Sequence, residues 1–113
     1  MALSIQYDRE LHELAAGFGL SETEMAGALG TTSRTVRRWL AGATPAPGSR
    51  ARIEDAFRIL ELLKTSVEPG SIPKWARRRV DMLNGARPAD LLAQGKLEPL
   101  IGLAEGLACG SFS

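Results

Sequence analysis

Residues 21–42, SETEMAGALGTTSRTVRRWLAG, constrain the fold more than any other stretch of the chain, because two short helices fit on either side of a glycine turn. Ser21 can cap the first helix, and Glu24, three residues later, can close a capping box. Gly30 supplies the left-handed residue that a tight turn after a helix requires. The inner seam between the two helices is predicted to contain Met25, Leu29, Val36 and Trp39, and Ala26 is small where the helices would cross. This spacing predicts a helix-turn-helix.

The outer face of the second predicted helix is polar and basic. It carries Thr32, Ser33, Arg34, Arg37 and Arg38. Arginine can bind O6 and N7 of guanine through two hydrogen bonds, serine and threonine can bind base edges or phosphates, and a helix N-terminus attracts phosphate. A solvated face of an ordinary helical bundle is the competing interpretation. We favour a DNA-binding surface, with the division between base and phosphate contacts left open.

The nearly neutral net charge of the chain excludes the class of strongly basic proteins that bind nucleic acid without sequence selectivity. The 113 residues include 14 Lys and Arg against 13 Asp and Glu, for a formal charge of +1. Up to Ser66 there are eight basic and eight acidic residues, and after it six and five. Any DNA binding is therefore local, and a single protomer is expected to bind weakly.

Cysteine usage and hydropathy indicate a cytoplasmic protein. Cys109 is the single cysteine, so no disulfide framework or cysteine-rich metal site is expected, and the thiol is predicted to be buried or idle. No apolar run approaches the roughly 20 residues that span a bilayer, and the N-terminus lacks the order of a signal peptide. We expect no membrane partner.

Helical periodicity predicts a first module over residues 1–66. A leading helix, which Gly17 and Gly19 would stop, precedes the two central helices, and a further helix capped by Ser49 follows them. The apolar faces of these flanking helices comprise Tyr7, Leu11, Leu14, Ala15 and Phe18 in the first and Ile53, Ala56, Phe57, Leu60 and Leu63 in the second. No alternating run predicts a sheet, so the fold class is all-α.

Residues 67–74, VEPGSIPK, predict a joint, and a smaller helical module over residues 67–113 follows it. One helix should begin at Pro73 and end at Asn84 and Gly85. Two more should cover a short segment from Pro88 to Gly95 and the apolar residues 97–107. These helices are short, so their leucines must be buried against one another, against the first module, or against another chain.

The sequence contains no group of residues for which a catalytic role is favoured over a structural one. His12 is the single histidine and is expected to be a solvated surface residue. No metal-ligand cluster, GxSxG, P-loop or GxGxxG pattern is present, so neither an enzyme nor a cofactor or metal site is predicted.

Three further features of the second module bear on partners. Arg77, Arg78 and Arg79 form the densest charge cluster, but on a helix they fan around the circumference, and their role stays open. Trp75 is either a core anchor or the centre of an interface. The uncharged ending GLACGSFS carries one aromatic ring, Phe112, which a pocket on another protein could accept.

Taken together, the two halves resemble the Xre/MbcA/ParS antitoxin family. The resemblance covers almost the whole chain: an Xre-like helix-turn-helix at residues 21–42, the segment LNGARPADLL at residues 83–92, and the ending G-x-F-S. The pairing of LxGxxPxxLL with that ending in one short chain is more specific than the first motif alone.

The resemblance implies that the partner is a RES-domain toxin that destroys NAD, and that the second half covers this toxin while the tail blocks its substrate pocket. It also implies that the first half represses the shared operon, with a homodimer inside a larger hetero-oligomer presenting paired helices to operator DNA. The toxin-binding residues would include Trp75, Leu83, Gly85, Pro88, Leu91, Leu92, Gly110, Ser111, Phe112 and Ser113.

Two other functions remain compatible with the sequence. One is a stand-alone helix-turn-helix transcription regulator whose second half only dimerises, and the other is a structural adaptor with a vestigial DNA unit. A neighbouring gene for a RES-domain protein, or a toxic partner that co-purifies, would separate an antitoxin from both.

Overall fold

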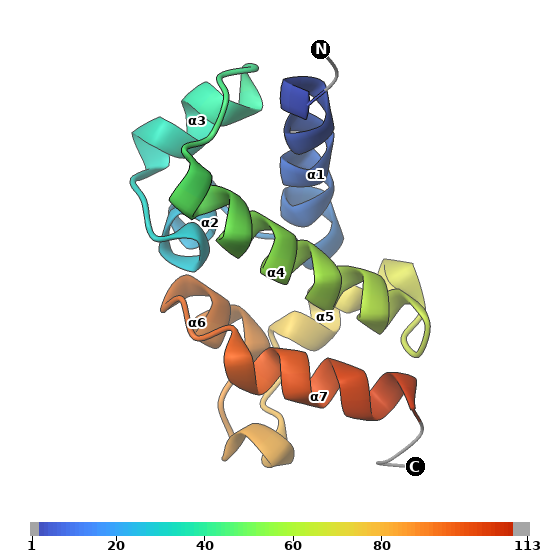
Figure 1. The fold of residues 1–113 in the computed structure, drawn as a ribbon. Coiled ribbons are helices and arrows are strands. Elements are labelled where there is room, and N and C mark those ends of the chain that lie inside the picture. Colours follow the sequence, from blue (N-terminus) through green and yellow to red (C-terminus); the bar gives the residue numbers. More distant parts are fainter. Residues whose placement is uncertain (1–2, 110–113) are drawn as a thin grey trace.

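The computed structural model describes residues 3–109, with side chains from residue 7 onward, and confirms the all-α fold class (Figure 1). Within residues 3–109 there is no strand, and one isolated bridge joins Val80 to Ala86. The elements are α1 (Leu3–Phe18), α2 (Glu22–Leu29), α3 (Ser33–Leu40), α4 (Pro47–Lys64), η1 (Pro69–Ser71), α5 (Ile72–Ala76), η2 (Asp81–Leu83), α6 (Pro88–Ala93) and α7 (Glu98–Ala108).

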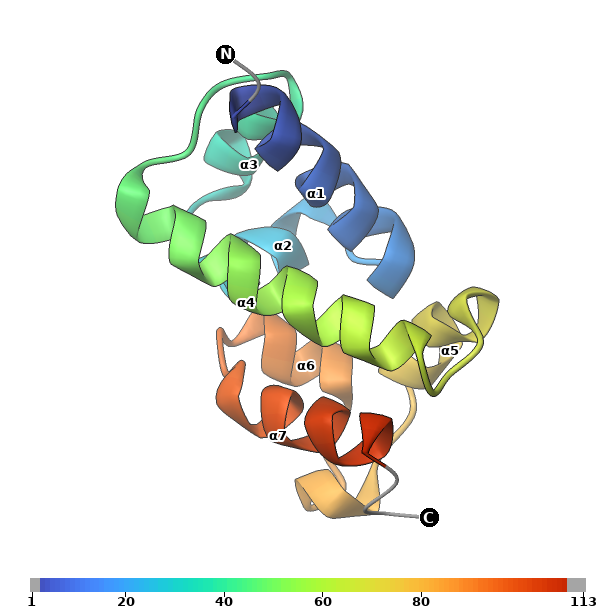
Figure 2. The same ribbon diagram turned by 45° about the vertical axis from the view of Figure 1, so that its right-hand side comes forward.

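The long helix α4 runs through the middle of an elongated molecule of 42 × 24 × 24 Å. Helices α1 and α3 lie on one side of α4, and α6 and α7 lie on the other (Figures 1 and 2). The two groups are in direct contact, because α7 packs against α4 and α6 packs against α2. The first helices of the chain and the last ones therefore share extensive interfaces.

The buried side chains form one hydrophobic cluster that includes both halves of the chain. Phe18 and Leu60 belong to it together with Leu92 and Leu100, and each is at most 1% exposed. Among the three places that the sequence allowed for the C-terminal leucines, the structure shows burial against each other and against the first module. In the described residues, Met82 is the exposed large hydrophobic side chain.

In the first half, one predicted helix boundary is wrong and another is confirmed in part, because Gly19 ends α1 and Gly17 does not. Gly17 lies inside α1, where a Cβ would come within 2.8 Å of Leu60 Cδ2, so this glycine allows α1 and α4 to approach; Gly19, with a φ of +68°, follows the helix. The fourth helix is capped at Ala46 and begins at Pro47 rather than after Ser49. Proline fits the first helical position because its φ is preset and its missing N–H needs no partner there.

The helix predicted from Pro73 to Asn84 is also wrong beyond its first turn. Helix α5 ends at Ala76, and Val80 then adopts an extended conformation and pairs with Ala86, with 3.1 Å between its N and the carbonyl oxygen. Asn84 and Gly85 both have positive φ, at 58° and 79°, so they reverse the chain as a tight turn instead of capping a long helix.

Gly27 sets the distance between α2 and α6. A Cβ on this residue would lie 1.8 Å from the carbonyl oxygen of Ala93. No side chain can be accommodated at that distance. The two backbones are therefore in direct contact, and this contact fixes the C-terminal helices against the pair α2–α3.

Candidate functional site

Both ends of α2 have the geometry that the sequence predicts. The Ser21 hydroxyl accepts from the Glu24 N–H at 3.1 Å, and the Glu24 carboxylate accepts from the Ser21 N–H at 2.9 Å, which completes the capping box. Gly30 is left-handed, with φ 69° and ψ 37°. The predicted seam residues Met25, Leu29, Val36 and Trp39 are buried, and so is Ala26.

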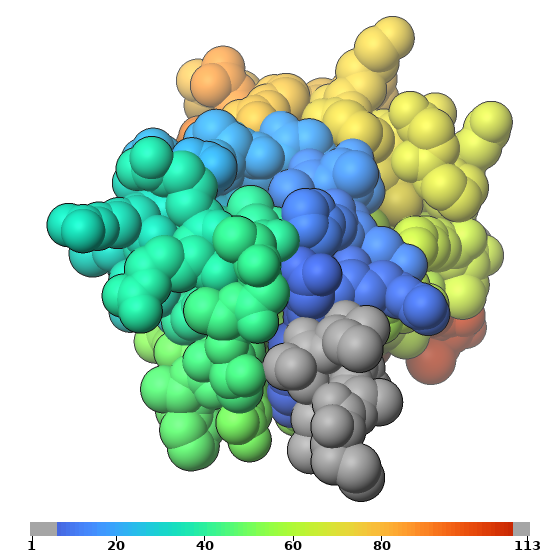
Figure 3. Space-filling view, turned by 90° about the horizontal axis from the view of Figure 1, so that it is seen from above, coloured from blue at the N-terminus to red at the C-terminus, as the bar shows by residue number. Residues whose placement is uncertain are grey.

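The outer face of α3 carries the residues predicted to contact DNA. Arg34, Arg37 and Arg38 are exposed, and Ser33 is half-buried in the first turn. Thr32 is exposed but caps α3, because its hydroxyl accepts from the Thr35 N–H at 3.2 Å. In Figure 3, the side chains of α3 form one edge of the molecule beside the α3–α4 connection. Three guanidinium groups are thus available along one helix.

One of these arginines is paired within the chain. Arg37 Nε lies 3.3 Å from Glu22 Oε1, across the gap between α3 and the first turn of α2. Both side chains remain about half exposed. Arg34 and Arg38 have no ion pair or side-chain hydrogen bond in the part of the chain that is described.

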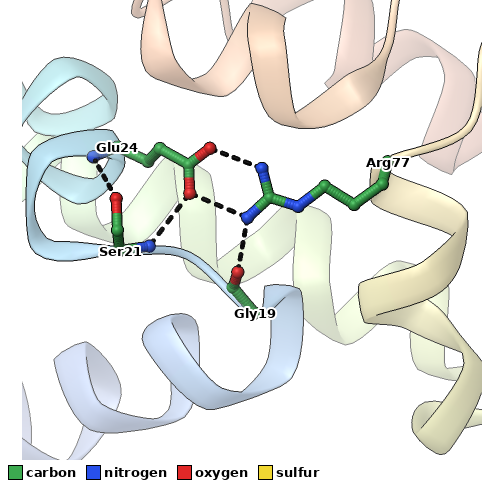
Figure 4. Close-up of polar contacts among 4 residues, drawn as sticks. All are labelled: Gly19, Ser21, Glu24 and Arg77. Atoms are coloured by element: carbon green, nitrogen blue, oxygen red, sulfur yellow. Dashed lines mark hydrogen bonds and ion pairs between the residues drawn. The ribbon is translucent and has the colours of Figure 1, made fainter.

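A second arginine, from the other half of the chain, binds the same turn of α2. Arg77 donates through Nη1 to Glu24 Oε2 and through Nη2 to Glu24 Oε1 at 2.8 Å (Figure 4). Its Nη2 also donates to the carbonyl oxygen of Gly19 at 2.6 Å. This fork joins the end of α5 to the capping box, and no local sequence pattern predicts it, because Glu24 and Arg77 are 53 residues apart.

The ion pair changes the acidity of Glu24. Hydrogen bonds from the Arg77 guanidinium, opposed by partial burial and supported by the Ser21 N–H, lower the pKa of Glu24 from 4.5 to about 2. The same contact raises the pKa of Arg77. Glu24 is therefore ionised at every physiological pH and has two structural partners at once.

The structure separates the three neighbouring arginines. Arg77 is fixed on Glu24 and Gly19, whereas Arg79 Nη1 donates to the carbonyl oxygen of Gly85 at 3.3 Å and stabilises the turn that follows η2. Arg78 is exposed and has no partner in residues 3–109. The cluster therefore does not form one binding patch.

The predicted toxin-binding residues fall into three groups. Leu83, Pro88 and Leu92 are buried in or beside the core, so they shape η2 and α6 from within. The half-buried group consists of Trp75, Gly85 and Leu91. Gly110, Ser111, Phe112 and Ser113 lie outside the described residues. A partner can reach the second group directly.

His12 and Cys109 are the remaining side chains that the sequence singles out. His12 is exposed, as expected, and its Nε2 lies 3.1 Å from the carbonyl oxygen of Leu40 and 3.3 Å from Asp8 Oδ1. Cys109 is exposed rather than buried. No cluster of metal-ligating side chains occurs over residues 3–109, and no helix in this range is long and apolar enough to cross a membrane.

No protein-family model matches the sequence. A curated relative does: the probable mycobacterial cidal antitoxin of Mycobacterium tuberculosis is 27% identical over 103 residues, which are 91% of this chain and 89% of the relative. The chain is a homologue of this antitoxin. The predicted resemblance to MbcA-type antitoxins, which the sequence extends to MbcA itself, is therefore confirmed as homology to an antitoxin of that type.

A solved structure agrees with the fold. A chain in the crystal structure of the M. tuberculosis MbcT-MbcA toxin-antitoxin complex matches with a TM-score of 0.69 and 21% identity. The match covers 94% of the present chain and 96% of the chain in the complex, so the two share their arrangement of helices over nearly their whole length.

Proposed function

We propose that the chain is the antitoxin of a type II toxin-antitoxin system, which binds a NAD-degrading RES-domain toxin and blocks it sterically. The observation that carries this proposal is homology to an antitoxin along nearly the whole length of both proteins. A protein in a toxin-antitoxin complex has the same fold. The proposal assigns no catalysis to this chain.

The toxin-binding role belongs to residues 67–113 in this proposal, and the DNA-binding role belongs to residues 1–66. Trp75, Gly85 and Leu91 are accessible enough to contact the toxin, while buried Leu92 and its neighbours hold them in place. Residues 110–113 would enter the substrate pocket, with Phe112 as an aromatic anchor.

Deleting Gly110–Ser113 tests the blocking mechanism. We expect the truncated chain to associate with the toxin but to protect NAD much less, because the helices that supply most of the contact remain. NAD loss in vitro is measured with toxin alone, with toxin and the full chain, and with toxin and the truncated chain. Undiminished protection by the truncated chain would show that the tail does not block the pocket.

The DNA-binding role rests on the exposed basic face of α3. Arg34 and Arg38 have no partner in the described residues and are available to phosphates or bases. In the cytoplasm, a homodimer within the antitoxin-toxin assembly would present two such faces to operator DNA and repress the operon.

Salt dependence of DNA binding tests this second role. Each lost phosphate contact reduces the slope of log affinity against log salt by about one. Arg34→Ala and Arg38→Ala should flatten the slope for the chain's own upstream DNA, and Lys96→Ala, an exposed charge between α6 and α7, should not. Absence of binding to that DNA, with and without the toxin, would contradict the role.

A further inference from the structure

Glu22 and Arg37 form an ion pair in a place where a carboxylate is unfavourable for DNA binding. Both lie on the exposed side of α2–α3, and the closest described approach is 3.3 Å between Arg37 Nε and Glu22 Oε1. A negative charge beside a DNA-binding face repels phosphates. An exposed ion pair contributes only about 0–1 kcal/mol to stability, and the position of Glu22 in the first turn of α2 adds a similarly small amount through the helix dipole.

The atoms in contact suggest what the carboxylate does. A guanidinium has five N–H donors in a planar fork, and Glu22 lies at the Nε position. The edge formed by Nη1 and Nη2 has no partner in the described part of the chain. Two parallel donors of this kind match O6 and N7 of guanine in the major groove.

We propose that Glu22 is a positioning residue, which holds Arg37 so that its Nη1–Nη2 edge binds one guanine of the DNA site. The inference rests on the proposed DNA-binding function. A restrained arginine loses less side-chain entropy when it binds, so its contact discriminates better between bases. Arg34 and Arg38 lack such a restraint in residues 3–109, and they suit the phosphate backbone, where exact orientation matters less.

The position of Arg37 on α3 supports a base contact. It lies one turn after Ser33 and Arg34, so the three side chains share the exposed side of the helix that begins at the Thr32 cap. Residues in the first turns of a recognition helix are those that approach base edges. Its side chain is 62% exposed, so most of it is open to a ligand.

The proposal makes two opposite expectations for Glu22→Gln. Removal of the negative charge should raise affinity for DNA of any sequence, because a repulsion is lost. Discrimination in favour of the guanine should fall, because Arg37 is no longer held. If Glu22 served only stability, its replacement would not raise the affinity for DNA and lower the discrimination for guanine at the same time.

The experiment uses the full chain and duplexes selected by it from a random library. Each guanine of a selected duplex is replaced in turn by 7-deazaguanine, which lacks the N7 acceptor. We expect one position at which the wild type loses affinity on the order of tenfold. Arg37→Ala should bind the parent duplex more weakly and lose little further at that position.

Glu22→Gln should reduce the 7-deazaguanine penalty at that position by several-fold while tightening binding to an unrelated duplex. Glu61→Gln, which removes a paired carboxylate from α4, is the matched control and should leave the penalty unchanged. An undiminished penalty in Glu22→Gln, or one that persists in Arg37→Ala, would overturn the inference even if DNA binding is selective. If no duplex is enriched, the proposed DNA-binding function fails instead.

Discussion

Arg77 donates to both carboxylate oxygens of Glu24, although one lies at the end of α5 and the other in the first turn of α2 (Figure 4). Glu24 also accepts from the Ser21 N–H, so one carboxylate both caps α2 and fixes the C-terminal half against it. The proposed toxin-binding half and the proposed DNA-binding unit are therefore joined by a directional polar contact as well as by the core.

Removing the Arg77 guanidinium should destabilise the fold. Arg77→Ala leaves Glu24 without its charged donor and Gly19 without a hydrogen bond, and we expect a loss of about 1 kcal/mol in the free energy of unfolding. Arg78→Ala, which removes an exposed neighbour, should change it by no more than about 0.5 kcal/mol. Denaturant titration of both variants measures the difference, and equal values would show that the fork contributes nothing.

Acid should remove the contribution of Glu24. Its pKa is about 2 in the folded protein against 4.5 ordinarily, so its stabilisation is complete above pH 4.5 and is lost as the pH falls towards 2. The stability difference between wild type and Glu24→Gln should therefore narrow over this range. Thermal unfolding from pH 6 to 2 tests this, with Glu68→Gln, an exposed carboxylate, as control. A constant difference would contradict the lowered pKa.

Gly27→Ala should be among the most damaging single substitutions in α2. Its Cβ would meet the Ala93 carbonyl oxygen at 1.8 Å, and because this atom belongs to the backbone, α6 must shift. We expect a loss of about 2 kcal/mol or more. Gly102→Ala in α7 meets nothing within 4 Å and should instead add about 0.5–1 kcal/mol. Chemical denaturation of both variants measures their free energies of unfolding. A stable Gly27→Ala variant, or a destabilised Gly102→Ala variant, would contradict the prediction.

Within the tail, the aromatic ring should matter more than the last hydroxyl. Phe112→Ala should weaken binding to the toxin more than Ser113→Ala, because a buried aromatic anchor contributes more than a rim hydroxyl. A binding titration with purified toxin compares the two. Equal effects would argue against an anchored ring.

Local signals predict α2 and α3 well. The capping box at Ser21 and the left-handed Gly30 depend on neighbouring residues alone, so the bounds of α2 and α3 follow from the sequence. The helix expected across residues 73–84 failed because the bridge between Val80 and Ala86 competes with helical hydrogen bonds. The helical periodicity of apolar residues does not reveal such a turn.

Contacts between distant segments could not be predicted. The pairing of Arg77 with Glu24 and the approach of Gly27 to Ala93 depend on how α2 meets the second half. The burial of the C-terminal leucines within the chain was one of three outcomes that the sequence allowed. The resemblance to an antitoxin family, by contrast, rests on LNGARPADLL and the ending G-x-F-S, which are local patterns.

Co-expression with the product of the adjacent gene tests the central claim most directly. The neighbour is expressed alone and together with this chain, growth is followed, and the pair is purified for evidence of a stable complex. If the chain is an antitoxin, the neighbour alone stops growth, and the chain restores it and co-purifies. A neighbour that is harmless by itself, or one whose toxicity persists beside a well-expressed chain, would contradict the account.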